Sequence, residues 1–380
     1  MTAPTPPVDE VVALTCELVR RPTHHPPAGQ PPSAGGDELA LCRHLAPLLA
    51  GRGADEVRVV ETGRAVGGPG GYVWARWGTP TLLLNVHVDT VPANTGWTRD
   101  PWAATVEDGR VWGLGACDTK GAIAAILCAL DRAPARDLAV LFSGDEERGT
   151  AAVHAFLASP AAGGLRHAIV CEPTSRRAGL RHRGVLAHAA TIRGRGGHSS
   201  RADDMPAPIV TMARLAVALD QLGRDHRGRG PADMPGLCMN VASIEGGVAF
   251  NVVPDAATLS WSVRPAPGFD RAAWDRQVAA LAASIDPAIT IETRLDHAPF
   301  ACGDEAWARR ILDGAVDDFV GLDFWTEAAL LQAAGIDAVV VGPGDIGQAH
   351  APDESVSIAD LRWAADGFTT ALERHAQDPR

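Results

Sequence analysis

Short apolar segments that alternate with amphipathic ones restrict the fold of this chain more than any other feature. Three segments carry dense apolar runs typical of buried strands, and they are 81–91 (TLLLNVHVDTV), 137–147 (DLAVLFSGDEE) and 166–174 (RHAIVCEPT). Apolar residues at three- and four-residue spacing predict helices over 8–21, 37–51, 121–133 and 358–375. This alternation predicts an α/β domain in which a mixed sheet carries helices on both faces.

The pattern changes at about residue 178 and returns at about residue 297. Between these points we expect the order strand, helix, strand, strand, helix, strand, with helices over 208–222 and 271–285. This order describes a small α+β unit of the ferredoxin-like, split βαβ type. We therefore predict two domains, one formed by 1–178 with 297–380 and the other inserted over 179–296.

Composition and charge exclude several classes of protein. The 380 residues include 34 Lys and Arg against 46 Asp and Glu, whereas nucleic-acid binding requires basic patches. No apolar stretch reaches the ~20 residues that span a bilayer, and residues 1–14 lack the features of a signal peptide. The seven cysteines form no C-x-x-C pair, which favours reduced thiols. We expect a cytoplasmic protein that binds neither nucleic acid nor a membrane.

Acids and histidines recur where the expected strands end. His87 and Asp89 lie two residues apart, so their side chains project from the same face of a strand. The others are Asp118 in the glycine-rich WGLGACDTKGA, Asp145, Glu146 and Glu147 in GDEE, Glu172 in CEPT and His350 in GPGDIGQAH. In an open α/β sheet, ligands bind at the carboxyl ends of strands. These residues therefore predict a site at one edge of the sheet.

Each motif alone also has a plainer interpretation. His87 with Asp89 equally describes a neutral core histidine with an acidic partner, and GDEE describes a solvated acidic loop. The glycine-rich loop suggests phosphate binding, but Lys120 precedes its glycine and Asp118 occupies the third glycine position of G-x-G-x-x-G. A carboxylate presented by a tight loop suits a cation better.

Together these residues form a set of nitrogen and oxygen ligands without thiolates. Imidazole with carboxylate suits Zn²⁺, Co²⁺ or Mn²⁺. Five ligands exceed what one tetrahedral ion that also holds water requires, and they match two ions that share a carboxylate. The sequence therefore predicts two divalent metal ions.

The blocks LNVHVDTVP, GLGACDTKG, SGDEE, CEPT, GRGGHSS and GPGDIGQAH resemble the signature blocks of the M20 family of di-metal amidohydrolases and exopeptidases, over nearly the whole chain. The resemblance implies that Asp118 bridges two ions, Zn²⁺ or Co²⁺. It places His87 and Glu172 at one ion, and Glu147 and His350 at the other.

The resemblance also implies roles beside the cations. Glu146 would be the general base, and Asp89 would orient the ring of His87. A cis peptide bond is implied between Asp118 and Thr119. A cis bond without proline costs ~3–4 kcal/mol, so the surrounding structure must hold it.

Further roles fall on the inserted domain and on the segment FWTEA (324–328). His198 matches a histidine that reaches into the active site of the partner subunit, which implies a homodimer. Asn251 and Arg264 match positions associated with the α-carboxylate of the substrate, and Glu327 is expected to face the substrate. A surface histidine at 198 and a strand-edge salt bridge at 264 are the alternatives.

FWTEA and GPGDI resemble acetylornithine deacetylases, and closely resemble their N-acetylcitrulline deacetylase relatives. The resemblance implies hydrolysis of an N-α-acetyl amino acid to acetate and the free amino acid, a reaction of arginine biosynthesis. The alternatives are a dipeptidase or general aminoacylase with the same centre, and an inactive binding homologue. The complete set of acids and histidines argues against the inactive homologue.

Two further expectations concern residues outside this set. His24 and His25 lie in a proline-rich loop, and we expect both to be solvated. Cys117 precedes Asp118, and we expect its thiol to be packed and to point away from the site.

Overall fold

The computed structural model describes residues 9–27 and 29–377. Contacts divide the chain into two compact units. The first, here called the sheet unit, consists of Met1–Leu180, Cys302–Val320 and Thr326–Arg380, and the second, the inserted unit, consists of Arg181–Ala301 and Gly321–Trp325. The segment 321–325 joins the inserted unit, although the sequence pattern groups it with the residues after 297. Residues 1–8, part of the stretch inspected for a signal peptide, lie outside the described residues.

The sheet unit is built around a mixed sheet. Neighbouring strands follow the order β1-β2-β6-β3-β7-β17-β8. β3 is parallel to β6 and β7, and β17 is parallel to β7, whereas β2 is antiparallel to β1 and β6. The strands are β1 (Glu56–Glu61), β2 (Gly71–Trp77), β3 (Leu82–His87), β6 (Leu138–Ser143), β7 (His167–Val170), β8 (Arg177–His182) and β17 (Asp337–Val340). β15 (Phe300–Ala301) and β16 (Asp318–Leu322) also pair with β8.

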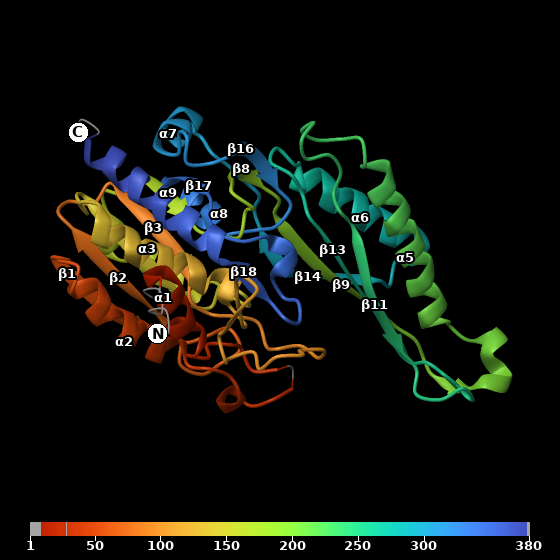
Figure 1. The fold of residues 1–380 in the computed structure, drawn as a ribbon. Coiled ribbons are helices and arrows are strands. Elements are labelled where there is room, and N and C mark those ends of the chain that lie inside the picture. Colours follow the sequence, from red (N-terminus) through yellow and green to blue (C-terminus); the bar gives the residue numbers. More distant parts are fainter. Residues whose placement is uncertain (1–8, 28, 378–380) are drawn as a thin grey trace. The chain divides into compact units, whose positions relative to one another are not determined.

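The helices of this unit form groups around the sheet. α1 (Glu10–Val19), α3 (Gly121–Arg132) and α9 (Ile358–Gln377) pack against one another, and Figure 1 shows α3 and α9 side by side across the strands. α2 (Glu38–Ala50) packs on β1 and β2, and α4 (Ala151–Leu157) packs on β2 and on α8 (Ala328–Ala333). α8 packs on β17, and α7 (Glu305–Ile311) contacts α9. The predicted mixed sheet with covering helices is confirmed.

A small sheet completes the sheet unit. Its order is β18-β5-β4, formed by β18 (Ser355–Ser357), β5 (Arg110–Trp112) and β4 (Thr105–Glu107). β18 pairs with β5, which ties the segment after His350 to the segment before Asp118.

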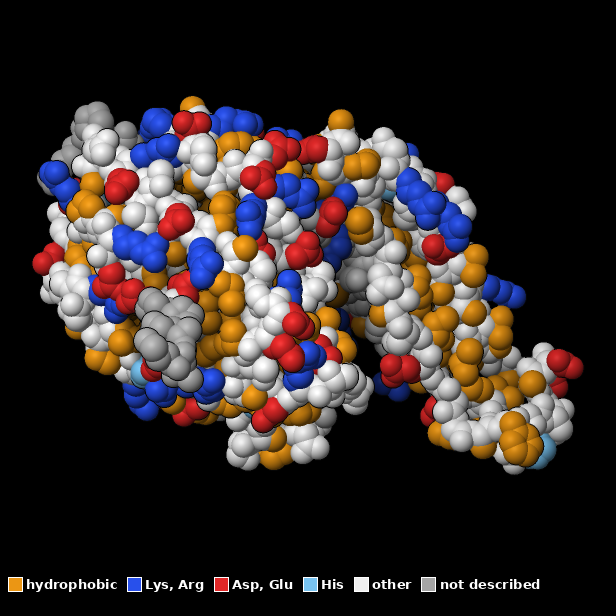
Figure 2. Space-filling view, in the orientation of Figure 1, with side chains coloured by type: hydrophobic (Ala, Val, Ile, Leu, Met, Phe, Trp, Pro, Cys, Tyr) orange, Lys and Arg blue, Asp and Glu red, His pale blue; other side chains and the backbone are white. Residues whose placement is uncertain are grey.

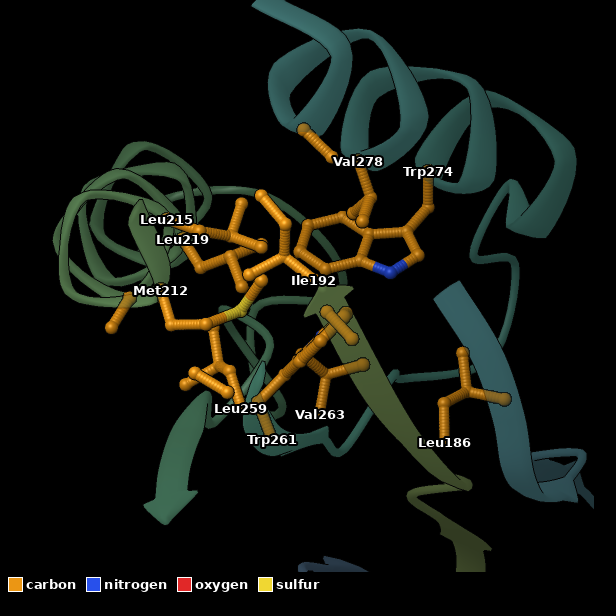
Figure 3. Close-up of a cluster of buried hydrophobic side chains, with 14 of the residues drawn as sticks. Leu186, Ile192, Met212, Leu215, Leu219, Leu259, Trp261, Val263, Trp274 and Val278 are labelled. Atoms are coloured by element: carbon orange, nitrogen blue, oxygen red, sulfur yellow. The ribbon is translucent and has the colours of Figure 1, made fainter. Parts of the chain in front are cut away.

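The inserted unit contains one antiparallel sheet in the order β11-β13-β9-β14. Its elements are β9 (Val185–Arg193), α5 (Pro208–Asp225), β11 (Asn240–Gly246), β13 (Ala256–Val263), α6 (Arg271–Ile285) and β14 (Thr290–His297). Every second side chain of β13 is buried, so one face of the sheet packs against the helices. Figure 3 shows Trp261 and Leu259 of this strand in one cluster with Met212 of α5 and Trp274 of α6.

Most elements lie where the sequence predicts them. The expected helices 121–133, 208–222 and 271–285 correspond to α3, α5 and α6. β1 and β2 were not predicted, because β1 (EVRVVE) is only partly buried and β2 (GYVWARW) does not alternate apolar and polar residues. No helix within 9–27 and 29–377 is both long enough and apolar enough to span a bilayer.

Candidate metal centre

Four neighbouring parallel strands bring the predicted ligands to one edge of the sheet. β3 ends at His87, and the loop after β6 carries Glu146 and Glu147. Glu172 lies two residues beyond β7, and the loop after β17 leads to His350. Because these strands are adjacent and parallel, their carboxyl ends share one edge. Residues far apart in the sequence therefore converge there.

The ring of His87 is buried between carboxylates. Its Nε2 lies 2.9 Å from Asp118 Oδ1 and 3.8 Å from Glu172 Oε1. Its Nδ1 lies 3.0 Å from the main-chain oxygen of Asp89 and 3.6 Å from Asp89 Oδ1. Burial opposes protonation of the ring, but hydrogen bonds with Asp118 and Asp89 raise the pKa of His87. With Nδ1 donating to Asp89, Nε2 is directed at the carboxylates, as in a ligating histidine.

His350 faces the opposite oxygen of Asp118. Its Nε2 lies 2.9 Å from Glu147 Oε2 and 3.6 Å from Asp118 Oδ2. The hydrogen bond with Glu147 raises the pKa of His350 to about 9. Asp118 thus directs Oδ1 at His87 and Oδ2 at His350, which is the arrangement that a carboxylate shared by two ions requires.

The carboxylates at this edge crowd one another. Burial raises the pKa of Glu147, Glu172 and the half-buried Glu146, and repulsion among these acids and Asp118 adds to it. Carboxylates this close cannot all stay ionised unless cations lie between them. Donor atoms of His87, Asp118 and Glu147 lie within 4.8 Å of one another. The donor set of imidazole and carboxylate therefore fits divalent cations such as Zn²⁺ or Co²⁺.

Glu354, which the sequence analysis missed, holds the loop that presents Asp118. It is buried, and its carboxylate accepts the backbone N–H groups of Gly115 at 3.1 Å, Cys117 at 2.9 Å and Asp118 at 3.0 Å. Burial and the charge of Asp118 raise the pKa of Glu354 to about 8. Its position four residues after His350 was the only available signal.

The backbone of this loop has two special features. The peptide bond between Asp118 and Thr119 is cis, as the family resemblance implied. Gly115 has a φ of +80°, and a Cβ there would lie 2.7 Å from Cγ2 of Thr90, so the position requires glycine. The thiol of Cys117 is buried, as predicted, and contacts the carbonyl of Asp345.

Asp89 is fully buried and surrounded by hydrogen-bond donors. Its Oδ1 accepts the backbone N–H of Glu146 at 3.1 Å, and its Oδ2 accepts that of Glu147 at 3.0 Å. His25 Nε2 lies 2.8 Å from Oδ2. Burial opposes ionisation, but hydrogen bonds from His25 and His87 hold the pKa of Asp89 well below its usual range. Asp89 therefore touches both the ring of His87 and the backbone of the GDEE loop.

The expectation that His25 is solvated is wrong. Its side chain is 0% exposed, because the proline-rich loop pairs with the residues that follow β3. Thr23 Oγ1 donates to the carbonyl of Val88 at 2.6 Å, and the backbone N–H of His25 donates to the carbonyl of Thr90 at 2.9 Å. His24, by contrast, is only half-buried and hydrogen-bonds the carbonyl of Ala34.

Asp145 also differs from its expected grouping with Glu146 and Glu147. It is buried with a φ of +63°, and its carboxylate accepts the backbone N–H groups of Ala65 at 3.0 Å and Ala151 at 3.3 Å. These bonds hold the Asp145 carboxylate against the backbone at Ala65 and Ala151. Asp145 therefore braces the loop from outside the ligand set.

Glu327 lies immediately before α8 and is 2% exposed. Its Oε2 accepts Ser143 Oγ at 2.6 Å and Asn85 Nδ2 at 2.9 Å, which ties it to β6 and β3. Among the described residues, Oε1 has no hydrogen-bond partner. Burial raises the pKa of Glu327. One oxygen of this carboxyl is thus committed to the sheet and the other is available.

His198, Asn251 and Arg264 lie in the inserted unit. β10 (Gly197–His198) pairs with β12 (Val252–Val253), which places the exposed His198 beside the exposed Asn251. Arg264 follows the other end of β13. It is half-buried, burial lowers the pKa of its guanidinium, and no carboxylate pairs with it within the described part of the chain. The strand-edge salt bridge considered for Arg264 is therefore not observed.

Known proteins resemble this chain over most of its length. The sequence model of peptidase family M20/M25/M40 matches residues 83–374. An N-acetyl-L-citrulline deacetylase from Xanthomonas campestris pv. campestris is 36% identical over 346 residues, 87% of this chain and 90% of that protein. An acetylornithine deacetylase from Proteus mirabilis is 33% identical over 302 residues, 74% and 76% of the two chains.

A solved structure has a similar fold. It is the crystal structure of an M20 family metallo-carboxypeptidase from Sulfolobus solfataricus, with a TM-score of 0.77 and 17% identity, and the match covers 98% of this chain and 100% of that one.

Proposed function

Because this chain belongs to peptidase family M20/M25/M40, a family of hydrolases, we propose that it hydrolyses an N-α-acetyl-L-amino acid to acetate and the free amino acid. The expected substrates are N-acetyl-L-citrulline and N-acetyl-L-ornithine, and the reaction suits a step of arginine biosynthesis. The observation that carries the proposal is the position of Asp118 between His87 and His350, with Glu146 at the same edge of the sheet.

The residues that would hold the cations are His87 and Glu172 at one ion, Glu147 and His350 at the other, and Asp118 between them. Two cations, Zn²⁺ or Co²⁺, would supply Lewis acidity to the acetyl carbonyl and lower the pKa of a water. Asp89 keeps the ring of His87 oriented for this role through Nδ1.

Glu146 moves the proton in this scheme. Its carboxylate takes the proton from the attacking water as the water's oxygen bonds to the acetyl carbon, and it delivers that proton to the departing amide nitrogen. Burial raises the pKa of Glu146, which makes its carboxylate a stronger proton acceptor than a solvated one. An amide nitrogen leaves as a neutral amine only when protonated, so one shuttling acid serves both halves of the reaction.

Replacing Glu146 with glutamine tests this assignment. Glu146→Gln removes the proton acceptor while keeping the shape, and general-base catalysis contributes ~10²–10⁴-fold. We expect kcat to fall by that factor with Co²⁺ affinity nearly unchanged. The matched control is Glu373→Gln, an exposed glutamate on α9. If Glu146→Gln turned over as fast as this control, the role of Glu146 would be wrong.

The acyl amino acid is best assigned by kinetics. The N-acetyl-L-citrulline deacetylase from Xanthomonas campestris is 36% identical to this chain, and the match covers 90% of that protein. This similarity favours acetylcitrulline as the substrate. In this proposal Glu327 borders the substrate through Oε1, the oxygen not bonded to Ser143 and Asn85. A panel of acetylcitrulline, acetylornithine, acetylmethionine and a dipeptide, with Zn²⁺ or Co²⁺ supplied, decides among them. A higher kcat/KM for the dipeptide would replace the deacetylase assignment with a dipeptidase.

A homodimer is part of the proposal, with the inserted unit as its dimerisation and lid domain. His198 and Asn251 lie near one end of β13, and Arg264 follows the other end. At ~3.3 Å per residue, these ends are ~23 Å apart, farther than one acyl amino acid extends. If all three residues serve the substrate, they come from two subunits, with His198 and Asn251 delivered across the interface.

The surface of the inserted unit has features that suit contact with a second copy of this chain. β11 is an edge strand of its sheet, and the neighbouring α5 exposes Val210 at 51% and Val217 at 72%. Ile244 of β11 is 40% exposed. Figure 2 shows hydrophobic side chains gathered on this unit. An unpaired edge with apolar neighbours suits pairing with an identical edge.

Mixed dimers test the delivery of His198. His198→Ala and Glu146→Gln are each expected to be nearly inactive alone. After random mixing, half the dimers are hybrid, and each has one complete site, so about a quarter of wild-type activity returns. A fully active monomer in sedimentation, or no recovery after verified subunit exchange, would overturn this arrangement.

A further inference from the structure

We propose that His25 is a positioning residue of the hydrolytic site, acting through Asp89 on His87 and on the GDEE loop. This inference rests on the proposed hydrolytic function. It starts from the burial of His25, whose side chain is 0% exposed although it lies in a proline-rich loop. A polar ring is costly to bury unless its hydrogen bond has a purpose.

The loop that carries His25 is fixed in place. Thr23 Oγ1 donates a hydrogen bond to the carbonyl of Val88, and the backbone N–H of His25 donates one to the carbonyl of Thr90. The backbone N–H of Gly36 donates to the carbonyl of His24 at 2.8 Å. The ring of His25 is therefore held on the strand extension that carries Asp89, with Nε2 2.8 Å from Asp89 Oδ2.

Asp89 transmits this contact to the reacting groups. Oδ1 accepts the N–H of Glu146 and lies 3.6 Å from Nδ1 of His87, and Oδ2 accepts the N–H of Glu147 and the ring N–H of His25. Oδ2 thus accepts two hydrogen bonds and Oδ1 accepts one, with the ring of His87 nearby. Without His25, Oδ2 keeps only the donor of Glu147, and the carboxylate is free to turn about its Cβ–Cγ bond. Such a turn would loosen the backbone of Glu146 and shift the carboxylate against the ring of His87, which itself donates to the main-chain oxygen of Asp89.

A third cation site is the competing interpretation of this cluster. His25, Glu38 and Asp89 have donor atoms within 4.8 Å of one another, and all three are buried. However, His25 and Asp89 are already in direct hydrogen-bond contact, and the guanidinium of Arg64 forms an ion pair with Glu38. The positive charge that a cation would supply is therefore present in Arg64. The cluster fits a positioning network and not a metal site.

The chain offers a matched pair of histidines for the test. His25→Met removes the donor at similar volume, and His25→Gln restores an N–H at the position of Nε2. His24→Met changes the adjacent ring, whose hydrogen bond goes to Ala34 and not to Asp89. Losing a direct hydrogen-bond partner of a metal ligand, which Asp89 is in this proposal, typically costs ~10–100-fold in activity or metal affinity, and His25 acts through Asp89.

We expect kcat of His25→Met to fall by that factor with KM within about twofold, and His25→Gln to regain at least about tenfold of a hundredfold loss. His24→Met should stay within about twofold of wild type. Co²⁺ affinity by calorimetry and the visible spectrum of the Co²⁺ protein should shift in His25→Met and return towards wild type in His25→Gln. A general loss of stability would not be reversed by the donor alone.

If His25→Met does not fold, the comparison is His25→Gln with His25→Asn, because the asparagine amide stands on the Nδ1 side and does not reach Asp89. Equal kcat and equal Co²⁺ spectra in these two variants would overturn the proposal, as would His25→Met with wild-type kcat. If no acyl amino acid is hydrolysed by wild type, the proposed function fails, and the Co²⁺ affinity and spectra still decide the role of His25.

Discussion

Replacing Gly115 with alanine should destabilise the sheet unit by an amount that the structure predicts in two parts. Gly115 has a φ of +80°, and holding alanine in this left-handed region costs ~1–2 kcal/mol. The new Cβ would lie 2.7 Å from Thr90 Cγ2 and 3.2 Å from Lys120 Cδ. Carbon atoms prefer ~3.5–4.0 Å, and relieving such an overlap costs ~1–3 kcal/mol. The free energy of unfolding should therefore fall by ~2–5 kcal/mol.

Gly109→Ala separates the two parts. Gly109 has a φ of +71°, but a Cβ there would meet nothing within 4 Å. It should cost only the backbone share, ~1–2 kcal/mol. The measurement is urea denaturation of the metal-free protein followed by circular dichroism, with both variants compared at the same pH. Gly115→Ala losing no more stability than Gly109→Ala would refute the close packing of this loop.

A double variant identifies the clashing atom. Thr90→Ser removes Cγ2, the atom nearest to the added Cβ. In the Gly115→Ala background this change should recover part of the lost stability, whereas in wild type it should only remove a buried methyl group. Equal effects in both backgrounds would mean that the two positions do not interact. Co²⁺ affinity, measured in parallel, should fall with Gly115→Ala, because this loop presents Asp118.

Three further outcomes follow. Removing bound metal ions with a chelator should lower the free energy of unfolding, because a cation at a hundredfold excess over its Kd contributes ~2.7 kcal/mol. A melting temperature that does not change when Zn²⁺ is added would contradict the metal centre. Iodoacetamide at pH 8 should modify Cys238, whose thiol is exposed. Burial raises the pKa of Cys302 to about 12, so in the folded protein Cys302 should stay protonated and unreactive up to pH 9.5. Mass spectrometry checks this, with Cys238→Ser as the control that takes up no label. Trp274→Ala should cost ~3–5 kcal/mol in the inserted unit, and a smaller loss would show that the cluster closes over the cavity.

The positions of the candidate ligands could be predicted because two sequence signals coincide there. Apolar runs mark the buried strands, and each run is followed by an acid or a histidine, as with His87 and Glu172. Adjacent parallel strands share an edge, so strand ends are a physical reason for convergence. The shared use of Asp118 by His87 and His350 required the fold, because sequence gives no orientation for the two carboxylate oxygens.

The supporting residues could not be predicted for different reasons. His25 and Asp89 are 64 residues apart, and only the pairing of the proline-rich loop with residues 88–90 brings them together. Glu354 binds backbone N–H groups, which leave no trace in residue type. Asp145 stands next to Glu146 in the sequence, but its carboxylate accepts backbone N–H groups at Ala65 and Ala151. Local sequence patterns indicate which residues are buried and whether a segment is a helix or a strand. These contacts depend instead on the path of the backbone between distant segments.

β7 and β17 are direct neighbours in the sheet, although the whole inserted unit lies between them in the sequence. Ala168 of β7 is paired with Ala338 of β17, and the parallel pairing of the two strands is regular along their whole length. The strands that lead to Glu172 and His350 are thus positioned by their own pairing and not by contacts within the inserted unit. Relatives can therefore differ in the inserted segment without a change in the framework that carries the candidate ligands.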